Sequence, residues 1–442
     1  MALPTQQQVM GWIEEICTQG IRRPGYDADR WCENWVAGHF KRIGLRDVRL
    51  EEVQVPRWTS PSARLTVGER TFAGFALPHT DAGVVEATLV IGTEGSSAAI
   101  AVVELVPSVL PQSFMTSIAT SSFDPDGDFE HEQQVLPFGP LVNGVAGPAV
   151  DADAVGFVGL LTGFGWETCD YYVPYDATHR SIVGLWLSKR DGLELLELVE
   201  SGATTGRIEV DATEEQVASH NVIGVLPGSS DEWVVIASHH DAPWASAVED
   251  ASGIALVLAQ AEHWAAVPEA DRPHNLLFLL TAGHMCHAAG TRGFLVDHAG
   301  LLDSIVLEVH LEHVARRCET DGENLLPTEL PEPRWWFTST NPSLEASVQV
   351  AIEANDLRRS LVLRPDIFFP EPPTDGAFFH THGVPLVQLL ASPSYLFDAA
   401  DTIDKIHGPS IEPIGRAVVS VIESTAGVSA EAMRAGVVKS PE

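Results

Sequence analysis

The chain is 442 residues long, which favours two domains, and it carries 61 acidic against 26 basic side chains, a formal net charge of −35. Such a surface repels nucleic acids and anionic membranes, so neither is expected as a partner. The sequence contains no apolar run long enough to span a bilayer. Its first residues lack the basic start and apolar core of a signal peptide, and its five cysteines have no framework spacing. We therefore expect a cytoplasmic protein.

Two amphipathic helices are predicted at the N-terminus. Apolar residues recur at helical spacing in residues 1–20 and again in residues 26–44, and Gly44 stands where the second helix should end. From about residue 56 to 210, short apolar stretches are separated by turn residues, which is typical of strands. Residues 107–147 lack clear periodicity and are expected to form a long functional loop.

The remainder of the chain has a different texture, because strands alternate with helices from about residue 216 to the C-terminus. This alternation predicts an α/β fold with a mostly parallel sheet and helices on both faces. We expect residues 1–55 and 216–442 to form this domain. Residues 56–215 are expected to form an inserted, mostly β domain.

Histidines and carboxylates follow three successive predicted strands of this domain. They are, in chain order, His239, His240 and Asp241, then His284 and His287, and then Glu312 and His313. Open α/β sheets place their chemistry at the carboxyl ends of their strands, and imidazole with carboxylate is an ordinary ligand set for zinc. The sequence therefore predicts a metal site. In it, the Asp241 carboxylate is expected to hold one nitrogen of His239 while the other nitrogen binds the metal.

Several short motifs carry a family resemblance. They are Asn221–Gly228, the strand end His239-x-Asp241, Asp250–Gly253, Thr374–Phe378, Gly383–Pro385 and Asp401–Asp404. With these motifs the chain resembles, over nearly its whole length, the zinc aminopeptidase family that includes bacterial leucyl aminopeptidases and glutamate carboxypeptidases. The resemblance implies that family's fold, together with the protease-associated domain that is often inserted in it. It also implies a site in which an aspartate and a water bridge two zinc ions and a glutamate is the general base.

The resemblance places the family's metal ligands on residues that are only partly kept in this chain. The first histidine ligand matches His239, the bridging aspartate falls on Glu249, and the strand-end aspartate falls on Glu312. The family's two adjacent glutamates, base and ligand, fall on Gly283-His284 or on His284-Met285. Both glutamates are therefore replaced in either register.

The replacements concentrate on one of the two ion positions, because the family's last histidine ligand falls on Phe397. What is implied is a mononuclear site of His239, Glu249 and Glu312, with His284 as a further candidate ligand. This set suits one divalent ion, with zinc expected first, and iron, manganese and cobalt are also compatible with it.

With the family's glutamate missing, another group must accept the proton of the metal-bound water. His287 is our candidate for this base, and His284 is the alternative, because imidazole titrates near neutral pH. His240, His380 and His382 are expected to contact the substrate, the last two because they precede the motif where the family shapes its substrate pocket. Weaker candidates for a role in the site are His310 and His313.

The sequence thus predicts a metallopeptidase-like hydrolase of the aminopeptidase or amidase type, which cleaves an amide or peptide bond in a small molecule or short peptide. Two alternatives stay open. One is a metalloenzyme on the same scaffold with a different reaction, such as a lyase or redox reaction, and the other is a catalytically inactive binding protein. The prediction also leaves open whether the chain forms a homo-oligomer.

Overall fold

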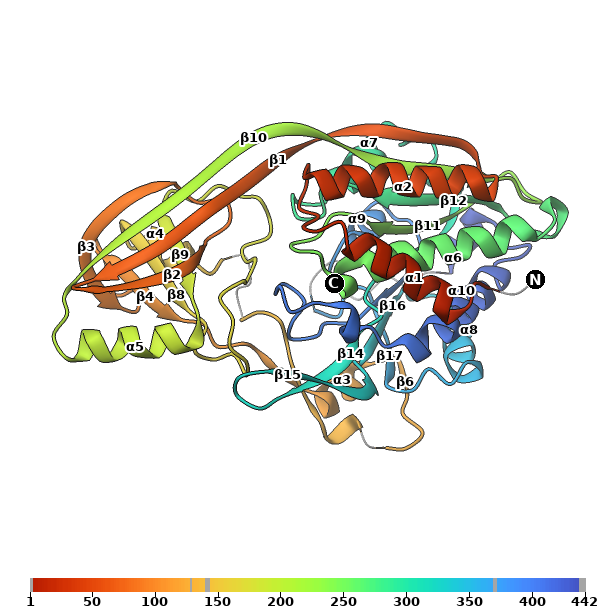
Figure 1. Cartoon of the computed structure of the whole chain (residues 1–442). Coiled ribbons are helices and arrows are strands. Elements are labelled where there is room, and N and C mark those ends of the chain that lie inside the picture. Colours follow the sequence, from red (N-terminus) through yellow and green to blue (C-terminus); the bar gives the residue numbers. More distant parts are fainter. Residues whose placement is uncertain (1–2, 128, 140–143, 369–371, 437–442) are drawn as a thin grey trace.

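The computed structural model of the chain has two lobes of unequal size, which are joined by two long strands (Figure 1). We call the larger one the main lobe and the smaller one the inserted lobe. Within the described ranges, no helix has both the length and the apolar character that crossing a membrane requires. The structure describes residues 3–127, 129–139, 144–368 and 372–436.

The two joining strands are β1 (Arg46–Val67) and β10 (Thr205–Leu226), which pair antiparallel along most of their length. Each is 22 residues long, far above the usual strand length, and together they run from one lobe into the other (Figure 1). Val55 pairs with Val217, so both expected domain boundaries lie at the same rung of this ladder. Because the sheet continues through that rung, the division into two domains stays a prediction.

The main lobe is built on a mixed sheet whose centre consists of four neighbouring parallel strands. In order across the sheet, these are β12 (Asn275–Thr281), β11 (Trp233–His239), β13 (Ile305–Leu311) and β18 (Leu386–Leu390). β10 flanks β12 antiparallel at one side. The other side consists of β16 (Arg334–Thr338), β17 (Ser360–Leu363) and β6 (Ser121–Phe123). The α/β class with a parallel centre is confirmed, although the whole sheet is mixed.

Helices cover both faces of this sheet, as predicted. Side chains of a strand alternate between faces, and in β11 Val234 and Ile236 pack in one apolar cluster while Val235 and Ala237 pack in another. The second cluster contains side chains of α7 (Ala289–Asp297) and α9 (Gly376–Thr381). The first contains side chains of α1 (Gln6–Cys17), α2 (Asp27–Ile43), α6 (Ser252–Ala266), α8 (Pro342–Ala354), α10 (Ile411–Glu423) and α11 (Ala430–Ala435).

The two N-terminal helices confirm the prediction made for them. α2 ends at Gly44, whose φ of 97° lies in the left-handed region that glycine adopts without strain. Its buried face carries two carboxylates, Asp29 and Glu33, toward the sheet. The residues that α1 buries are the apolar ones at helical spacing, namely Val9, Trp12, Ile13 and Ile16.

The inserted lobe has its own sheet, in which β1 and β10 take part. Its inner strands β9, β8, β4 and β3 pair parallel with one another, and α5 (Lys189–Glu200) packs into the apolar cluster of this lobe through Leu195. The identification of this lobe as a protease-associated domain stays a prediction. Its strands, in order between β1 and β10, are β2 (Arg70–Ala76), β9 (Val183–Leu187), β8 (Gly156–Leu160), β4 (Ile100–Glu104) and β3 (Gly83–Ile91).

Residues 107–147, expected as a long loop, contain short regular elements instead. β6 pairs with β17, so this segment leaves the inserted lobe and extends the sheet of the main lobe. Residues 128 and 140–143 of the segment lie outside the described residues. Its other elements are β5 (Val109–Pro111), α3 (Gln112–Ile118) and β7 (Gln133–Val135), and a separate pair of strands is formed by β14 (Arg316–Thr320) and β15 (Leu325–Pro331).

Candidate metal centre

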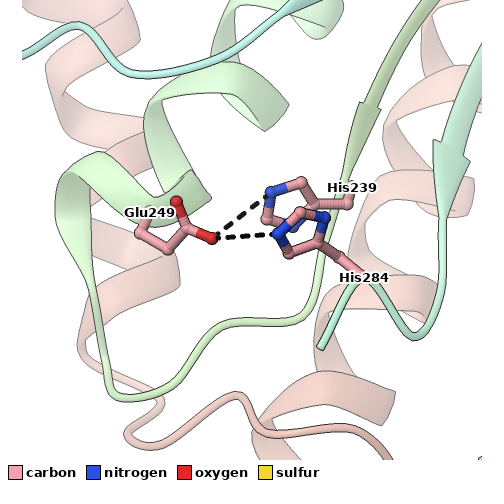
Figure 2. Close-up of side chains that lie close together, drawn as sticks. All are labelled: His239, Glu249 and His284. Atoms are coloured by element: carbon pink, nitrogen blue, oxygen red, sulfur yellow. Dashed lines mark ion pairs between the residues drawn. The ribbon is translucent and has the colours of Figure 1, made fainter. Parts of the chain in front are cut away.

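The four side chains expected as metal ligands converge at the carboxyl ends of β11, β12 and β13. His239 Nε2 lies 3.6 Å from Glu249 Oε1 and 3.8 Å from Glu312 Oε1, and His284 Nε2 lies 3.7 Å from the same Glu249 oxygen. Figure 2 shows both imidazoles directed at Glu249, which lies in the turn before α6. Strand ends that are distant in sequence thus bring their donor atoms together, as the sequence predicts.

Several of these donor atoms are buried without a hydrogen-bond partner. His239 Nε2, Glu249 Oε1 and Glu312 Oε2 accept no hydrogen bond from any residue that the structure describes. A buried polar atom left unpaired costs roughly 1–3 kcal/mol, so three such atoms at one point need an explanation. Ligands of a tetrahedral zinc with bonds of about 2.0–2.1 Å lie roughly 3.4 Å apart, close to the 3.6 and 3.7 Å that separate His239 Nε2 and His284 Nε2 from Glu249 Oε1. The donor set and its spacing therefore fit one divalent metal ion.

His239 presents the unprotonated nitrogen of a neutral ring to the cluster. Its Nδ1 donates to the main-chain carbonyl of Asp241 at 2.9 Å, which leaves the lone pair of Nε2 directed at the cluster. Burial, with the charge of His284 nearby, holds the pKa of His239 below its usual value. The ring also stacks on that of His284, with centroids 4.0 Å apart and planes 10° from parallel.

The role expected of the Asp241 carboxylate needs a correction. Its two oxygens accept the main-chain N–H groups of His284 and Met285, each at 3.0 Å, and not a nitrogen of His239. The carboxylate turns toward the loop after β12 because that loop presents two N–H groups with no partner in a strand. Asp241 therefore holds the loop that carries His284, while its carbonyl orients His239.

Asp375 orients His284 and was not recognised from the sequence, where it stood only within a motif. Its Oδ1 accepts from His284 Nδ1 at 2.7 Å, and its Oδ2 accepts the hydroxyls of Thr281 and Thr291 at 2.9 and 2.6 Å. Burial opposes a charge on His284, but the Asp375 carboxylate outweighs it and raises the pKa of His284 to about 10. A carboxylate behind the imidazole is the usual support of a metal-binding histidine.

His313, a weak candidate from the sequence, contacts Glu249 directly. Its Nε2 lies 2.5 Å from Glu249 Oε2, and its Nδ1 lies 2.6 Å from the carbonyl oxygen of Ala391. A carbonyl and a carboxylate only accept, so both nitrogens carry protons and the ring is a cation. Although burial acts against it, Glu249 raises the pKa of His313 to about 9. The left-handed φ of 58° at His313 turns its side chain back toward the site, which strand alternation does not predict.

Two buried side chains, His310 and behind it Glu308, support Glu312 from behind. His310 lies between Glu308 and Glu312, with Nδ1 3.0 Å from Glu308 Oε1 and Nε2 2.9 Å from Glu312 Oε1. The hydroxyl of Thr374 also donates to Glu312 Oε1, at 2.5 Å. Burial raises the pKa of Glu312, but His310 outweighs it and holds that pKa well below the usual range. Glu312 is thus an ionised carboxylate with one oxygen, Oε2, still free to bind.

An aromatic stack occupies the position where the resemblance places the family's last histidine ligand. The Phe397 ring lies 4.5 Å from that of Tyr175 at 26°, and Tyr175 lies 6.2 Å from His284 at 14°. Tyr175 belongs to the inserted lobe, between β8 and β9, and the Tyr172 N–H donates to the Phe397 carbonyl at 2.9 Å. Position 397 therefore packs against Tyr175, which stacks on His284, and its side chain offers no donor atom.

The loop that carries this ring contains a buried acid, Asp398. Burial raises the pKa of its carboxyl to about 7, although the N–H of Ala400 and the hydroxyl of Thr168 oppose this. Aspartate in an unfolded chain titrates near 4, so the protonated carboxyl stabilises the fold fully below about pH 4 and this stabilisation is lost as the pH rises through about 7.

We therefore expect the free energy of unfolding to fall by roughly 2–4 kcal/mol between about pH 4 and 7 through Asp398 alone. An Asp398→Asn variant, compared with the unchanged protein by urea unfolding at several pH values, should lack this part of the slope. Equal slopes in the two proteins would contradict the expectation.

A cavity of about 220 Å³ opens beside His284, and His287 lines it together with Tyr175, Thr374 and Phe378. His287 is exposed, and its Nε2 lies 2.9 Å from the Thr178 hydroxyl. The structure thus places His287 at the wall of a cavity next to a proposed ligand. Its role as the base stays a prediction.

The three residues expected to contact the substrate do not line this cavity. His240 is buried on the opposite face of the sheet, where Asp29 Oδ1 and the His220 carbonyl engage its two nitrogens at 2.7 and 2.9 Å. His382 is exposed and bonds the Phe378 carbonyl of its own helix at 2.7 Å. His380 is half-buried in the last turn of α9, whereas that helix faces the cavity through Ala377 and Phe378. The expectation is wrong for His240 because strand alternation turns it away from His239.

Comparison with known proteins identifies this architecture. Residues 221–422 match the model of a family described as Peptidase family M28. Among solved structures, a zinc aminopeptidase from Bacillus subtilis is 15% identical, with a TM-score of 0.69 over 96% of this chain and 95% of that chain. A peptidase M28 precursor from Shewanella amazonensis is 17% identical, with a TM-score of 0.69 over 95% and 92%. An aminopeptidase from Aneurinibacillus is 16% identical, with a TM-score of 0.62 over 95% and 93%.

None of the curated proteins matches the chain. At such low identities the solved structures establish the fold, and the family model spans every strand end at which the proposed ligands lie. Residues 221–422 therefore match peptidase family M28, and the chain is metallopeptidase-like, with the fold of the zinc aminopeptidases.

Proposed function

We propose that the chain is a metal-dependent hydrolase that cleaves an amide or peptide bond in a small substrate and uses one divalent ion, zinc in the first place. The observation that carries this proposal is the convergence of unpaired, buried donor atoms from His239, Glu249 and Glu312. His284 adds a nitrogen 3.7 Å from Glu249. The fold and the family match also support hydrolysis as the reaction of such a centre on this scaffold.

Two features of the structure favour one ion over the two of the resembled family. Phe397 offers no ligand atom and its ring packs on Tyr175. The other oxygen of Glu249, which a bridging carboxylate would give to a second ion, is held by the protonated ring of His313. A fixed positive charge at that oxygen opposes a second cation, because the two would lie within a few ångströms in a buried site.

The mechanism that we propose follows from the groups that these side chains would bind, orient or deprotonate. A bound divalent ion polarises a carbonyl and lowers the pKa of a coordinated water. His239, His284, Glu249 and Glu312 would hold that ion, while His313 fixes the orientation of one carboxylate. The cavity of about 220 Å³ beside His284 admits a group the size of one residue, in keeping with a small molecule or short peptide as substrate. His287, at the wall of this cavity, would take a proton from a group in it.

The test is metal content, measured by plasma mass spectrometry on the purified protein, together with hydrolysis of a panel of aminoacyl and peptidyl amides. We expect one ion per chain, loss of that ion and of hydrolysis in His239→Ala, and retention of both in the control His382→Ala. Two ions per chain would contradict the mononuclear site. Absence of metal after reconstitution would favour a binding protein without catalysis.

A second function has one specific observation in its favour. His239, Glu249 and His284 form a group of two histidines and one carboxylate whose ligand atoms lie within 4.8 Å of one another. That donor set with open positions is also the one used by non-haem iron oxygenases. Iron in the metal analysis, combined with no hydrolysis across the amide panel, would favour a redox reaction on this scaffold.

A further inference from the structure

A second cavity, of about 540 Å³, lies apart from the metal centre. It forms where the segment around α3 and β7 meets the turn after β8, strand β14 and the loop after β18. Neither the four proposed ligands nor His313 line it. The polar and charged side chains in its wall include Gln112, Glu132, Gln134, Arg317, Glu319 and Glu332.

A chain of hydrogen bonds fixes which atoms this wall presents. Gln134 Nε2 donates to the Ser392 carbonyl at 3.1 Å and to Glu332 Oε1 at 2.9 Å. Because a carbonyl only accepts, the nitrogen of Gln134 must face it, and its oxygen then accepts from Gln112 Nε2 at 3.0 Å. The atom left at the end of the chain is therefore the oxygen of Gln112. Gln112 is fully buried, and this oxygen has no partner among the described residues.

Glu332 adds a second acceptor to the same wall. Its side chain is 6% exposed, and of its two oxygens only Oε1 receives a hydrogen bond from the described residues. Burial raises the pKa of Glu332 to about 7, even though Arg317, Arg359 and Gln134 oppose the shift. The hydrogen bonds and positive charges around the Glu332 carboxylate thus do not offset its burial. A further positive charge placed beside it would favour its ionised form.

The arginines near the cavity are already paired. Arg359 binds Glu132 through both of its terminal nitrogens, at 2.9 and 2.6 Å, and Arg317 also pairs with Glu132. Both guanidinium groups thus pair with Glu132, and among the described residues neither forms an ion pair with Glu332. Around Gln134 the unpaired atom is an acceptor, the oxygen of Gln112, although the same wall also holds a buried donor, Trp166 Nε1, without a partner among the described residues.

We propose that this cavity is a binding site for a small organic cation, whose ammonium or guanidinium group donates to Gln112 Oε1 and to the Glu332 carboxylate. The apolar stem of such a ligand would lie against the rim of the cavity. Large apolar side chains that are exposed to solvent are present there, namely Val106, Val109 and Val135. An alkylamine, or the side chain of a basic amino acid, combines a cationic group with an apolar stem. Binding of either part does not depend on the metal.

The test is isothermal titration of the full chain with agmatine, L-lysine amide and pentylamine, with pentanol and glutarate as neutral and anionic counterparts. We expect saturable binding of the cations and none of the counterparts. Gln112→Leu and Glu332→Gln should each weaken binding by about tenfold or more, the loss expected when a hydrogen bond to a charged group is removed. The control Glu86→Gln, at an exposed position of β3 that does not line the cavity, should bind as the unchanged protein does.

Cation binding no tighter than that of pentanol or glutarate would overturn the proposal, and so would unchanged binding in both variants. Thermal melting of each variant checks that it folds, and Glu332→Gln, which preserves shape, decides the matter if Gln112→Leu does not fold. His239→Ala should still bind the cations, because the proposed site is separate from the metal centre. Binding that disappears in His239→Ala would assign the cations to the metal site and overturn the proposal.

Discussion

Replacing Asp375 with alanine is expected to weaken metal binding about 10- to 100-fold, the usual effect of removing the group behind a metal-binding histidine. Asp375 holds the Nδ1–H of His284 at 2.7 Å and is itself fixed by the hydroxyls of Thr281 and Thr291. Without it, the imidazole loses both its orientation and the carboxylate that strengthens its donor nitrogen. The dissociation constant for zinc, measured by competition with a chromophoric chelator, checks this.

A matched control for this experiment is Asp356→Ala, in which an exposed carboxylate is removed far from the strand ends. It should bind zinc as the unchanged protein does. Asp375→Asn tests the charge alone, because the amide oxygen can still accept from His284 while the negative charge is gone. Unchanged affinity in Asp375→Ala would mean that His284 is no ligand, and the site would then rest on His239, Glu249 and Glu312 alone.

Replacing Asp29 with alanine is expected to lower the free energy of unfolding by about 3–5 kcal/mol, the range seen when one partner of a buried ion pair is removed. Asp29 is fully buried and accepts from the Gly25 N–H and the Ser219 hydroxyl at 2.8 and 3.1 Å, besides its contact with His240. Burial opposes a charge on His240, but Asp29 outweighs it and raises the pKa of His240 to about 9. Without Asp29, that buried imidazolium would lose its partner.

Urea unfolding at neutral pH measures this loss. The control is Asp27→Ala, at an exposed position in the first turn of the same helix, where a change below about 1 kcal/mol is expected from the lost interaction with the helix dipole. A similar, small change in the free energy of unfolding of both variants would contradict the stabilisation that we assign to the buried pair of Asp29 and His240. Metal content should stay at the level of the unchanged protein in both, because Asp29 lies on the face of the sheet away from the ligands.

The group around Asp29 also shows why proximity of ligand types is weaker evidence than unpaired atoms. Asp29, Glu33 and His240 lie close enough together to hold an ion. Yet every side-chain oxygen and ring nitrogen of the three has a hydrogen-bond partner, including the Ser219 hydroxyl and groups of His220. This group therefore ties α2 to the sheet, whereas the cluster at His239 leaves donor atoms free.

The fold could be predicted from the sequence wherever a pattern is local. The apolar spacing that marks α1 and α2, and the glycine that ends α2, act within a few residues. The strands β1 and β10 were harder to predict, because the texture of the sequence changes at about residue 56, inside β1. In the structure β1 continues, and its register shifts between Thr59 and Ser62, an irregularity that accommodates Pro61.

For the site, the sequence by itself determined the donor types and their positions at the ends of strands, because the alternation of strand and helix is a local signal and parallel strands end at one edge. It did not determine which groups meet. Asp375 reaches His284 across 91 positions of the chain, and Tyr175 arrives from the other lobe. A left-handed residue at His313 reverses the expected direction of its side chain. Those contacts depend on the packing of distant segments and on single backbone angles, so only the tertiary structure decided them.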